Sequence, residues 1–523
     1  MTDFSSENRI ERGTENGTGS AAESRTICLL NDSFPPVIDG VANAVVNYAK
    51  NINAHYGRAF VVTPDIPGGA DDSAFPYPVI RYPSIDTRKV FGYVTGNPFA
   101  PGTIYNVLQQ NPDLLHLHCP MVSAMLAWQL RETRDIPLVL TWHSKFDTDI
   151  AGIVHNRLLR DEVMRTVLHN VNACDEVWAV SEGAGDDLRN FGYEGDIIVM
   201  QNGVDLPRGG VAEHLVVEAT GEYDLPADVP VFLFVGRMKW YKGLRIILEA
   251  LARLHKLHRA FRMVFIGGGG DMEEVIALTE QLKLTPFCIF TGPIHDREKL
   301  RAWYTRANLL LFPSAYDTNG LVVREAAACG TGTVMLGGSC ASEGVTDGRN
   351  GFLIDSSAES MADCLLRLYE NHGKAGEVGL AAQKELYISW EEAVAHATER
   401  YEIVLDRHKS GQYKRMHQPR DLFMKSHGKL MNFMGEVQAE AYTTRDDFLE
   451  EFLSYTTLVQ DYAQNLYDRA NEAKTSLENR AVETRTAIET KALEARTAIE
   501  TKAQETRTAI ETKAQETIDK LRS

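Results

Sequence analysis

The segment FVGRMKWYKG, residues 234–243, decides the fold of this chain, because it marks the end of a strand and the start of a helix. The apolar run 231–235 has the length of a strand, and a glycine and a helical stretch follow it. Arg237 and Lys242 lie on the turn between them. Backbone N–H groups at a helix start attract anions, and a guanidinium fork and an ammonium add to that attraction. The segment predicts a phosphate-binding turn; the alternative is a surface Arg and Lys on an ordinary turn.

A second segment, PSAYDTNGLVVREAAACG at 313–330, follows the apolar run 309–312 in the same way. Asp317 and Glu325 stand eight residues apart across a predicted loop-to-helix junction. Gly320 permits close approach of the backbone, and the N–H groups of Leu321 and Val322 begin a helix, where anions bind. We expect a ligand-binding loop here. The plainer interpretation is a helix whose N-terminal acids complement its dipole.

Short apolar runs alternate with helical stretches along most of the chain, which predicts βαβ units and buried parallel sheets. The expected strands fall into two groups: 26–30, 59–63, 114–118, 138–141, 176–180 and 197–200, then 231–235, 263–266, 288–290, 309–312 and 333–336. The expected fold class is α/β, with two Rossmann-like, doubly wound domains facing an interdomain cleft and a long helical C-terminal extension. Ligands of such sheets bind at the carboxyl ends of the strands.

The expected domain boundaries follow changes in composition along the 523 residues. We expect a disordered leader at 1–24, an N-terminal Rossmann-like domain on the acceptor side at 25–206 and a linker at 207–229. A C-terminal Rossmann-like donor domain is expected at 230–385 and a closing helix at 386–408. The rest is expected to form a basic and apolar helical region at 409–480 and a repeat helix at 481–523. The repeat helix rests on three 11-residue units between 483 and 515, a period that keeps each position on a fixed helix face.

Composition and charge narrow the classes of function. With 44% hydrophobic and 24% charged residues the chain is typical of globular proteins, and no apolar run reaches the roughly 18 residues of a membrane span. The first 24 residues lack the apolar core of a signal peptide. Seven scattered cysteines without a CxxC pair favour reduced thiols in the cytoplasm over a disulfide framework or a zinc site. A net charge of −18 disfavours nucleic acid as a partner.

The motifs together resemble those of the family-4 retaining glycosyltransferases of the GT-B fold, also called group 1. The resemblance covers about residues 26–405. Its motifs are NDSFPPVIDGVANAV (31–45), DLLHLHCP (113–120), TWHSKFD (141–147), QNGVD (201–205), FVGRMKWYKG (234–243), IGGGG (266–270) and a D-x7-E segment (317–325). Each is weak or moderate alone, and their order and spacing make them specific. The resemblance implies a retaining, metal-independent hexosyltransferase that uses a UDP- or GDP-sugar and no cofactor.

The resemblance also implies roles for individual positions in donor binding. Arg237 and Lys242 match the pair of cations that binds the donor diphosphate, called the diphosphate clamp below. Gly40 matches the glycine by which the N-terminal domain approaches the donor phosphates. Glu325 matches the ribose-binding glutamate. The other donor-side positions surround the nucleobase, the ribose or the phosphates: Gly268, Ile294, Asn319, Gly320, Leu321 and Val322. Asn202 to Asp205 resemble the segment that leads into the interdomain hinge.

Two histidines and one aspartate are expected near the transferred sugar. His118 matches the family's histidine beside the sugar and the acceptor, whereas His116 is expected to point to the opposite face of its strand. His143 is either an acceptor-side base or a structural residue. Asp317 stands where the family has Glu, and Thr-Asn-Gly follows it in place of a Gly-Phe-Gly-like step. Because aspartate is one methylene shorter, we expect the sugar contact either to shift or to recruit Asn319, and the sugar preference to differ.

The implied mechanism needs positioning and charge stabilisation more than a protein nucleophile. No side chain is an obvious nucleophile with its own base. The clamp cations and the helix start after Gly320 hold the departing diphosphate, and His118 and Asp317 hold sugar hydroxyls. Asp147 and Asp149 resemble a metal-binding acidic pair, but they lie away from the clamp in sequence, and a solvated loop explains them.

The C-terminal tail has a different character. Residues 407–434 hold seven Lys or Arg and one acid, interleaved with Leu, Phe and Met. One interpretation is contact with an anionic membrane surface, which places the protein on the inner face of the cell membrane and favours a glycerolipid or a lipid-linked envelope precursor as acceptor. The other is a basic helix packed on the acidic catalytic body. Residues 448–467 carry a stripe of apolar side chains at helical spacing, which favours self-association. The 11-residue repeats fit a coiled coil, a spacer helix or a lipid-surface helix.

The rival to an enzyme is a non-catalytic GT-B scaffold that organises partners or membrane through its C-terminal helices. A scaffold would neither transfer nor hydrolyse a donor. Replacement of Glu325 by Ala would leave a scaffold unaffected and would impair an enzyme, so the two hypotheses are separable.

Overall fold

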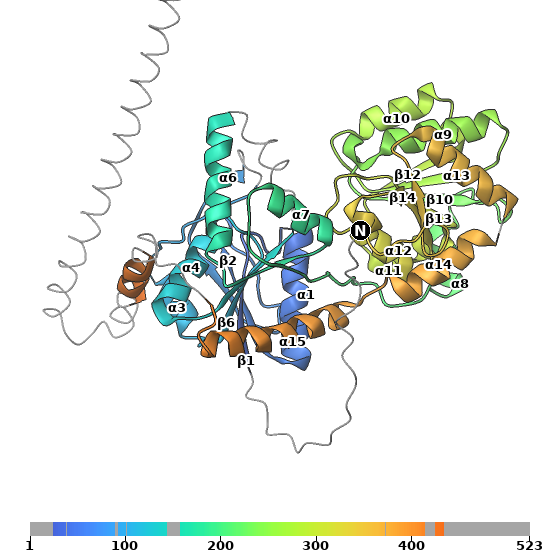
Figure 1. Ribbon diagram of the computed structural model, residues 1–523. Helices are drawn as coiled ribbons and strands as arrows, with labels where there is room; N and C mark the ends of the chain where they lie inside the picture. Colours follow the sequence, from blue (N-terminus) through green and yellow to red (C-terminus); the bar gives the residue numbers. More distant parts are fainter. Residues whose placement is uncertain are drawn as a thin grey trace, which may run out of the picture. The chain divides into compact units, whose positions relative to one another are not determined.

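The computed structural model of the chain describes residues 25–37, 39–88, 93–100, 102–143, 157–371, 373–413 and 424–432. Within these residues, two parallel sheets are each flanked by helices (Figure 1). The expected α/β class with two doubly wound domains is confirmed. The expected leader 1–24, the repeat helix 481–523 and most of the 409–480 region lie outside the described residues, as do Asp147 and Asp149.

The first sheet has seven parallel strands in the order β3-β2-β1-β6-β7-β8-β9. They are β1 (Arg25–Leu30), β2 (Gly57–Pro64), β3 (Val79–Tyr82), β6 (Leu114–Leu117), β7 (Leu138–Trp142), β8 (Glu176–Ala179) and β9 (Ile197–Val199). Helices α1 (Gly40–His55), α3 (Thr103–Leu108), α4 (Val122–Arg134), α6 (Arg157–Asn172) and α7 (Glu182–Asn190) accompany the sheet, with a small antiparallel pair, β4 (Ser84–Ile85) and β5 (Thr95–Gly96). Every residue of β6 is buried, as both faces of a covered parallel sheet require.

The second sheet has six parallel strands in the order β12-β11-β10-β13-β14-β15. They are β10 (Val231–Val235), β11 (Arg262–Ile266), β12 (Cys288–Gly292), β13 (Leu309–Phe312), β14 (Gly332–Leu336) and β15 (Phe352–Ile354). The helices are α9 (Leu244–Lys256), α10 (Met272–Gln281), α11 (Arg297–Arg306), α12 (Leu321–Ala328), α13 (Ala358–Glu370) and α14 (Lys374–Glu385), with the short helices η1 (Trp240–Lys242), η2 (Thr285–Phe287) and η3 (Cys340–Ser342). Strands from all parts of the sheet meet in one apolar core.

The strands expected from the sequence are all present, and the sequence pattern missed two edge strands. In β3 only Tyr82 is buried, and Arg81 pairs with Asp72 at 2.8 Å, so the segment lacks an apolar run. Strand β15 is only three residues long. Both lie at an edge of their sheet, where one neighbour and partial burial are enough.

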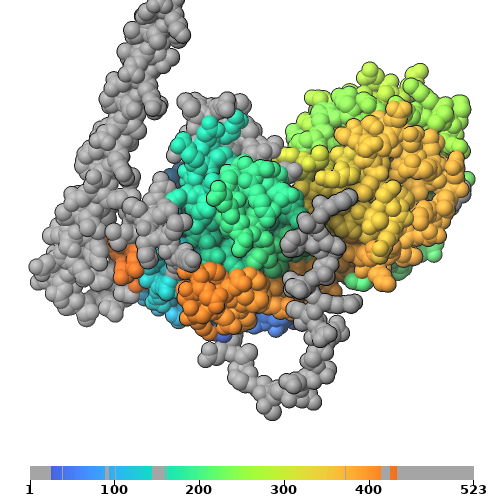
Figure 2. Space-filling model, in the orientation of Figure 1, coloured from blue at the N-terminus to red at the C-terminus, as the bar shows by residue number. Residues whose placement is uncertain are grey.

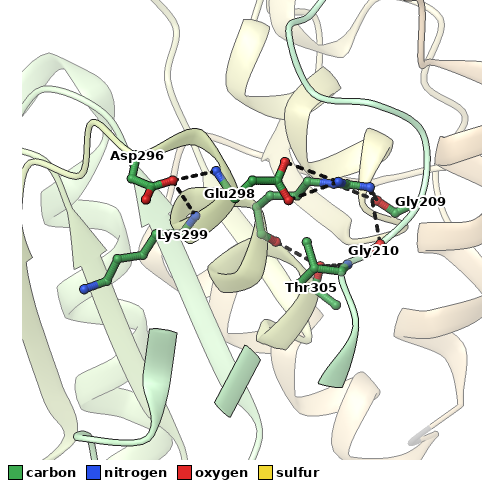
Figure 3. Close-up of polar contacts among 8 residues, drawn as sticks. Gly209, Gly210, Asp296, Glu298, Lys299 and Thr305 are labelled. Atoms are coloured by element: carbon green, nitrogen blue, oxygen red, sulfur yellow. Dashed lines mark hydrogen bonds and ion pairs between the residues drawn. The ribbon is translucent and has the colours of Figure 1, made fainter. Parts of the chain in front are cut away.

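The expected linker 207–229 differs from a plain connection, because it contains a helix, α8 (Glu213–Thr220). This helix packs against α11. Before it, the backbone carbonyl of Gly209 accepts hydrogen bonds from Arg301 Nε at 3.1 Å and Nη2 at 2.9 Å (Figure 3). Val211 N donates to Thr305 Oγ1 at 3.2 Å. Most of the linker therefore belongs to the second domain.

The chain returns to the first domain through α15 (Trp390–Lys409), which begins with a capping box of Ser389 and Glu392. Its buried side chains, among them Trp390 and Tyr401, join the core of the first domain. In Figure 1 the orange α15 runs beside the blue α1, and in Figure 2 its surface lies against that of the first domain. The expected closing helix 386–408 is thus a helix of the first domain's core.

The chain passes from the first domain to the second near Val204 and returns near Ser389, and these two segments contact each other. Val204 and Ser389 form a parallel bridge, and Val204 N donates to Ile388 O at 3.1 Å. A Cβ on Gly203 would lie 2.4 Å from Trp390 N, so only glycine permits this approach. The two crossings lie side by side.

A short helix at 424–432 packs on the first domain. Met424, Leu430 and Met431 are buried, and His427 Nδ1 lies 2.7 Å from Gln129 Oε1 on α4. For these three apolar residues of the basic segment the structure shows packing on the protein. No helix among the described residues is long and apolar enough to cross a membrane.

Candidate functional site

The order of the strands places the second-domain residues together. Strand β10 lies between β11 and β13, so the strand order reverses there, and the carboxyl ends of β10 and β13 meet at the position where ligands of such sheets bind. Arg237 and Lys242 follow β10, and Asp317 follows β13. Residues 75 positions apart are therefore brought to one edge of the sheet.

Lys242 and Asp317 form an ion pair through the ammonium and Oδ1. Lys242 is only 8% exposed, and its Nζ lies 5.7 Å from the centre of the Phe312 ring. Asp317 Oδ2 accepts a 2.6 Å hydrogen bond from the Ser314 hydroxyl. A buried ammonium requires a counter-charge, and Asp317 supplies it. The sequence prediction gave the two residues separate partners, whereas the structure joins them.

Arg237 differs from the other two cations of its segment. It is exposed, and within the described part of the chain no hydrogen bond or ion pair engages its guanidinium. Lys239, by contrast, pairs with Asp271 at 2.9 Å. Arg237 is therefore available to an anion at the strand end, next to the buried Lys242.

Gly320 begins α12 in the left-handed conformation, with φ 58°. A Cβ there would lie 2.7 Å from the Cβ of Ala341, so both conformation and space demand glycine. Leu321 and Val322 turn their half-buried side chains to the core, which leaves their backbone N–H groups as the groups that can meet a ligand. Asn319 is buried, and its Oδ1 accepts from Arg324 Nε at 3.3 Å.

The carboxyl ends of β11 and β12 carry Gly268 and Ile294. Gly267, just before, has φ 134°, and its Cβ would lie 2.0 Å from the carbonyl oxygen of Gly236, which seats the loop on the end of β10. A Cβ on Gly268 would meet only the Pro293 ring, at 3.6 Å. Ile294 packs half-buried on the second-domain core. Both residues stay predictions as nucleobase or ribose neighbours.

Glu325 is held by two partners from α11. Arg297 Nη2 donates to Oε1 at 2.8 Å, and the Tyr304 hydroxyl donates to Oε2 at 2.9 Å. Neither partner could be predicted from the sequence, because a hydrogen bond across 21 or 28 residues has no local pattern.

In the first sheet the strand order reverses between β1 and β6, and Gly40 and His118 follow these two strands. Gly40 opens α1 behind the N-cap Asp39, whose side chain accepts from the N–H groups of Val41 and Ala42. A Cβ on Gly40 would touch nothing within 4 Å, so its backbone faces open space. This placement is compatible with the predicted phosphate approach.

His118 and His143 form a buried pair, with His118 Nδ1 3.0 Å from His143 Nε2. His118 Nε2 has no hydrogen-bond partner among the described residues. Burial lowers the pKa of His143 to about 3, and burial together with the neighbouring histidines His116 and His143 lowers that of His118 well below 6.5. Both rings are therefore neutral near pH 7, one donating to the other. The two interpretations of His143 stay open.

His116 is satisfied inside the core. Its Nδ1 lies 2.6 Å from the Tyr401 hydroxyl and its Nε2 lies 2.7 Å from Thr141 Oγ1. The opposite orientation expected for His116 and His118 is wrong, because residues two positions apart along a strand share a face. Their ring centres lie 4.1 Å apart, and both rings contact Tyr48. His116 has a partner for each ring nitrogen, whereas Nε2 of His118 has none among the described residues.

Thr318, which the sequence prediction did not assign, connects the Asp317 loop to the first domain. Its hydroxyl donates to the carbonyl oxygen of His143 at 2.6 Å, and its own carbonyl oxygen accepts from Ser181 Oγ at 2.5 Å. Since a glycine stands here in the usual family pattern, the departure from that pattern adds a side-chain contact beside the histidine pair.

Comparison with known proteins agrees with the geometry. Residues 38–208 match the model described as Glycosyltransferase Family 4, and residues 218–385 match that of Glycosyl transferases group 1. The chain is 29% identical over 305 residues to D-inositol 3-phosphate glycosyltransferase of Xylanimonas cellulosilytica, covering 54% of this chain and 70% of that protein. It is 26% identical over 341 residues to GDP-mannose-dependent alpha-mannosyltransferase of Corynebacterium glutamicum, covering 63% and 76%, respectively.

Solved structures share the fold. HepE of Anabaena in complex with UDP superposes with a TM-score of 0.59 at 19% identity, covering 72% of this chain and 99% of that one. Sucrose-phosphate synthase of Thermosynechococcus elongatus gives 0.58 at 21% identity, covering 73% and 99%. With both family models matched in order, over the two sheets that carry the site, the chain belongs to the family-4, group 1 glycosyltransferases of the GT-B fold, which use nucleotide sugars.

Proposed function

We propose that the protein is a retaining, metal-independent glycosyltransferase that moves a hexose from a UDP- or GDP-sugar to a hydroxyl group of its acceptor, without a cofactor. The observation that carries the proposal is the partly buried Lys242–Asp317 pair, together with the exposed Arg237 on the same turn as Lys242, where the strand order reverses in the second sheet. Two cations and the start of α12 can neutralise a departing diphosphate, which is the charge stabilisation that a metal supplies in other enzymes.

The proposed transfer relies on the diphosphate that leaves. In the free protein Asp317 neutralises Lys242; when the donor binds, its phosphates provide a second counter-charge, and Asp317 can then turn an oxygen to a sugar hydroxyl. The neutral His118 presents its Nε2 to the sugar or the acceptor. We propose same-face attack assisted by a phosphate oxygen, because the family retains the anomeric configuration and Asp317 is engaged as a counter-ion.

The acceptor is proposed from two sources. A relative named for D-inositol 3-phosphate favours a polyol phosphate as acceptor. The basic segment favours a glycerolipid or a lipid-linked precursor, and thus a peripheral place on the cytoplasmic face of a membrane, although Met424, Leu430 and Met431 are buried on the protein.

The function is tested by donor hydrolysis and transfer with a panel of UDP- and GDP-sugars. We expect turnover with one of them, lost in Glu325→Ala and Lys242→Ala. A chain that binds no nucleotide sugar and turns over none would instead be the non-catalytic GT-B scaffold, and the proposal would be wrong.

The proposed contact with a membrane is tested by sedimentation with vesicles of phosphatidylglycerol and phosphatidylcholine. Full-length protein is compared with a chain ending at Tyr413, which keeps α15 intact. We expect only the full-length protein to sediment, and less at high salt. Equal recovery in the supernatant would contradict membrane contact, and light scattering of the same two proteins measures self-association through the C-terminal helices.

A further inference from the structure

Helix α11 brings a guanidinium and a phenol to the two oxygens of one carboxylate. Arg297 and Tyr304 are seven residues apart on α11, about two turns, so they share a face of the helix. Arg297 reaches Oε1 of Glu325 and Tyr304 reaches Oε2, at 2.8 and 2.9 Å. Each oxygen of the carboxylate on α12 thus has one donor from α11.

The three side chains form a series from the core to the solvent. Tyr304 is fully buried, the Glu325 side chain is 13% exposed and the Arg297 side chain is 44% exposed. Burial first, and then the charge of Glu325, raise the pKa of Tyr304, so its hydroxyl keeps its proton and acts as the donor. The carboxylate is bound from the protein side by a buried phenol and from the outer side by a partly exposed guanidinium.

Helix α11 is itself well anchored (Figure 3). Asp296 caps its first turn by accepting from the N–H groups of Glu298 and Lys299 at 2.9 and 3.1 Å. One turn after Arg297, Arg301 binds the carbonyl oxygen of Gly209 in the linker. An anchored helix holds its two donors in fixed places, and so fixes the direction of the carboxylate.

We propose that Arg297 and Tyr304 are positioning residues that direct Glu325 toward two neighbouring ribose hydroxyls, and so make the donor site prefer ribonucleotides to 2′-deoxyribonucleotides. The inference rests on the proposed function. An ionised carboxylate offers about four lone-pair directions. One on each oxygen is used by α11, which leaves one on each oxygen, side by side, for a pair of hydroxyls. A 2′-deoxyribose offers only one hydroxyl and leaves the second direction unused.

The test measures binding of UDP, 2′-deoxy-UDP, GDP and 2′-deoxy-GDP to the full-length chain by titration calorimetry. We expect the parent to bind the ribonucleotide of the preferred base about tenfold more tightly than its deoxy form, the size of one hydrogen bond to a charged group. Tyr304→Phe keeps the ring and removes only the donor, and it should lower this ratio about threefold or more. Tyr369→Phe is the matched control, because its hydroxyl donates to Ala260 O elsewhere in the same domain.

Arginine is tested in the same way. Arg297→Gln should lower the ratio, and Arg297→Lys, which keeps a donor and the charge, should retain more of it. Arg253→Gln is the control, since Arg253 pairs with the exposed Glu359 at 3.1 Å.

Four outcomes would overturn the inference. If Tyr304→Phe and Arg297→Gln weaken ribo- and deoxynucleotides equally, or weaken neither, then Arg297 and Tyr304 do not direct Glu325, and the donor site stands. If Glu325→Ala binds all four nucleotides as the parent does, or if the parent binds none, the proposed donor site is wrong and the inference fails with it.

Discussion

The hydroxyl of Tyr401 lies 2.6 Å from Nδ1 of His116, a residue 285 positions earlier in the chain. Both are fully buried, and the bond joins α15 to the strand that ends in the histidine pair. Helix α15 therefore contributes a buried hydrogen bond to the strand that precedes His118.

Tyr401→Phe should destabilise the protein, because it leaves a buried imidazole nitrogen without its partner. The expected loss in the free energy of unfolding is about 1–3 kcal/mol. Guanidinium unfolding with an unchanged m-value measures it. Ile403→Ala, on the exposed side of the same helix, is the control and should stay within about 0.5 kcal/mol. Equal stability of both variants would contradict a structural role for the bond.

Loss of either clamp cation should slow turnover. Arg237→Ala and Lys242→Ala remove a preorganised charge from the diphosphate, and each should lower kcat by about 100-fold or more. Steady-state kinetics with the preferred donor measures the effect. Lys239→Ala lies in the same segment but removes only a pair with Asp271, and it should keep nearly full activity. A similar loss in all three variants would indicate general disruption of the turn.

Asp317→Glu restores the family's usual residue and adds one methylene. Because Asp317 bridges Lys242 and Ser314, the longer side chain should change which sugar hydroxyl it reaches. We expect the ratio of kcat/KM between two donor sugars of one nucleotide to shift by about tenfold, on the order of one hydrogen bond to a charged group. An unchanged ratio would show that Asp317 serves only as the counter-ion of Lys242.

The histidine pair should make the protein sensitive to acid. Burial lowers the pKa of folded His143 to about 3, whereas the unfolded chain has about 6.5, so the unfolded state binds more protons between these values. The free energy of unfolding should therefore fall as the pH drops below about 6.5, by up to about 1.4 kcal/mol per pH unit for this residue.

Urea unfolding at several pH values between 4 and 7 measures this slope. His143→Gln should reduce it, while the remaining slope comes from His116 and His118, whose pKa burial also lowers. His214→Gln, on the exposed surface of α8, is the control and should keep the slope of the parent. A parallel pH profile for His143→Gln would contradict a buried, neutral His143.

The sequence predicts the strands, and it predicts which strands have candidate site residues at their carboxyl ends, because apolar runs and the residues directly after them are local patterns. Gly40, His118, Arg237 and Asp317 could be placed at carboxyl ends for that reason. The strand order, and with it the meeting of Lys242 and Asp317, depends on which strands pair.

Other features have no sequence signal at all. The partners of Glu325 come from a neighbouring helix, and the contacts of Thr318 come from the first domain. Helix α8 was missed because EHLVVEAT sits between Gly- and Pro-bearing stretches, where composition indicates a loop. Its formation depends on packing against α11, which local propensity does not contain.

The bridge between Val204 and Ser389 limits how the two domains can move. Two connections bonded side by side act as a single axis, so we expect rotation about that line to be the soft motion of the protein. Donor entry and product release would then share one opening movement, and its rate would set an upper limit on turnover.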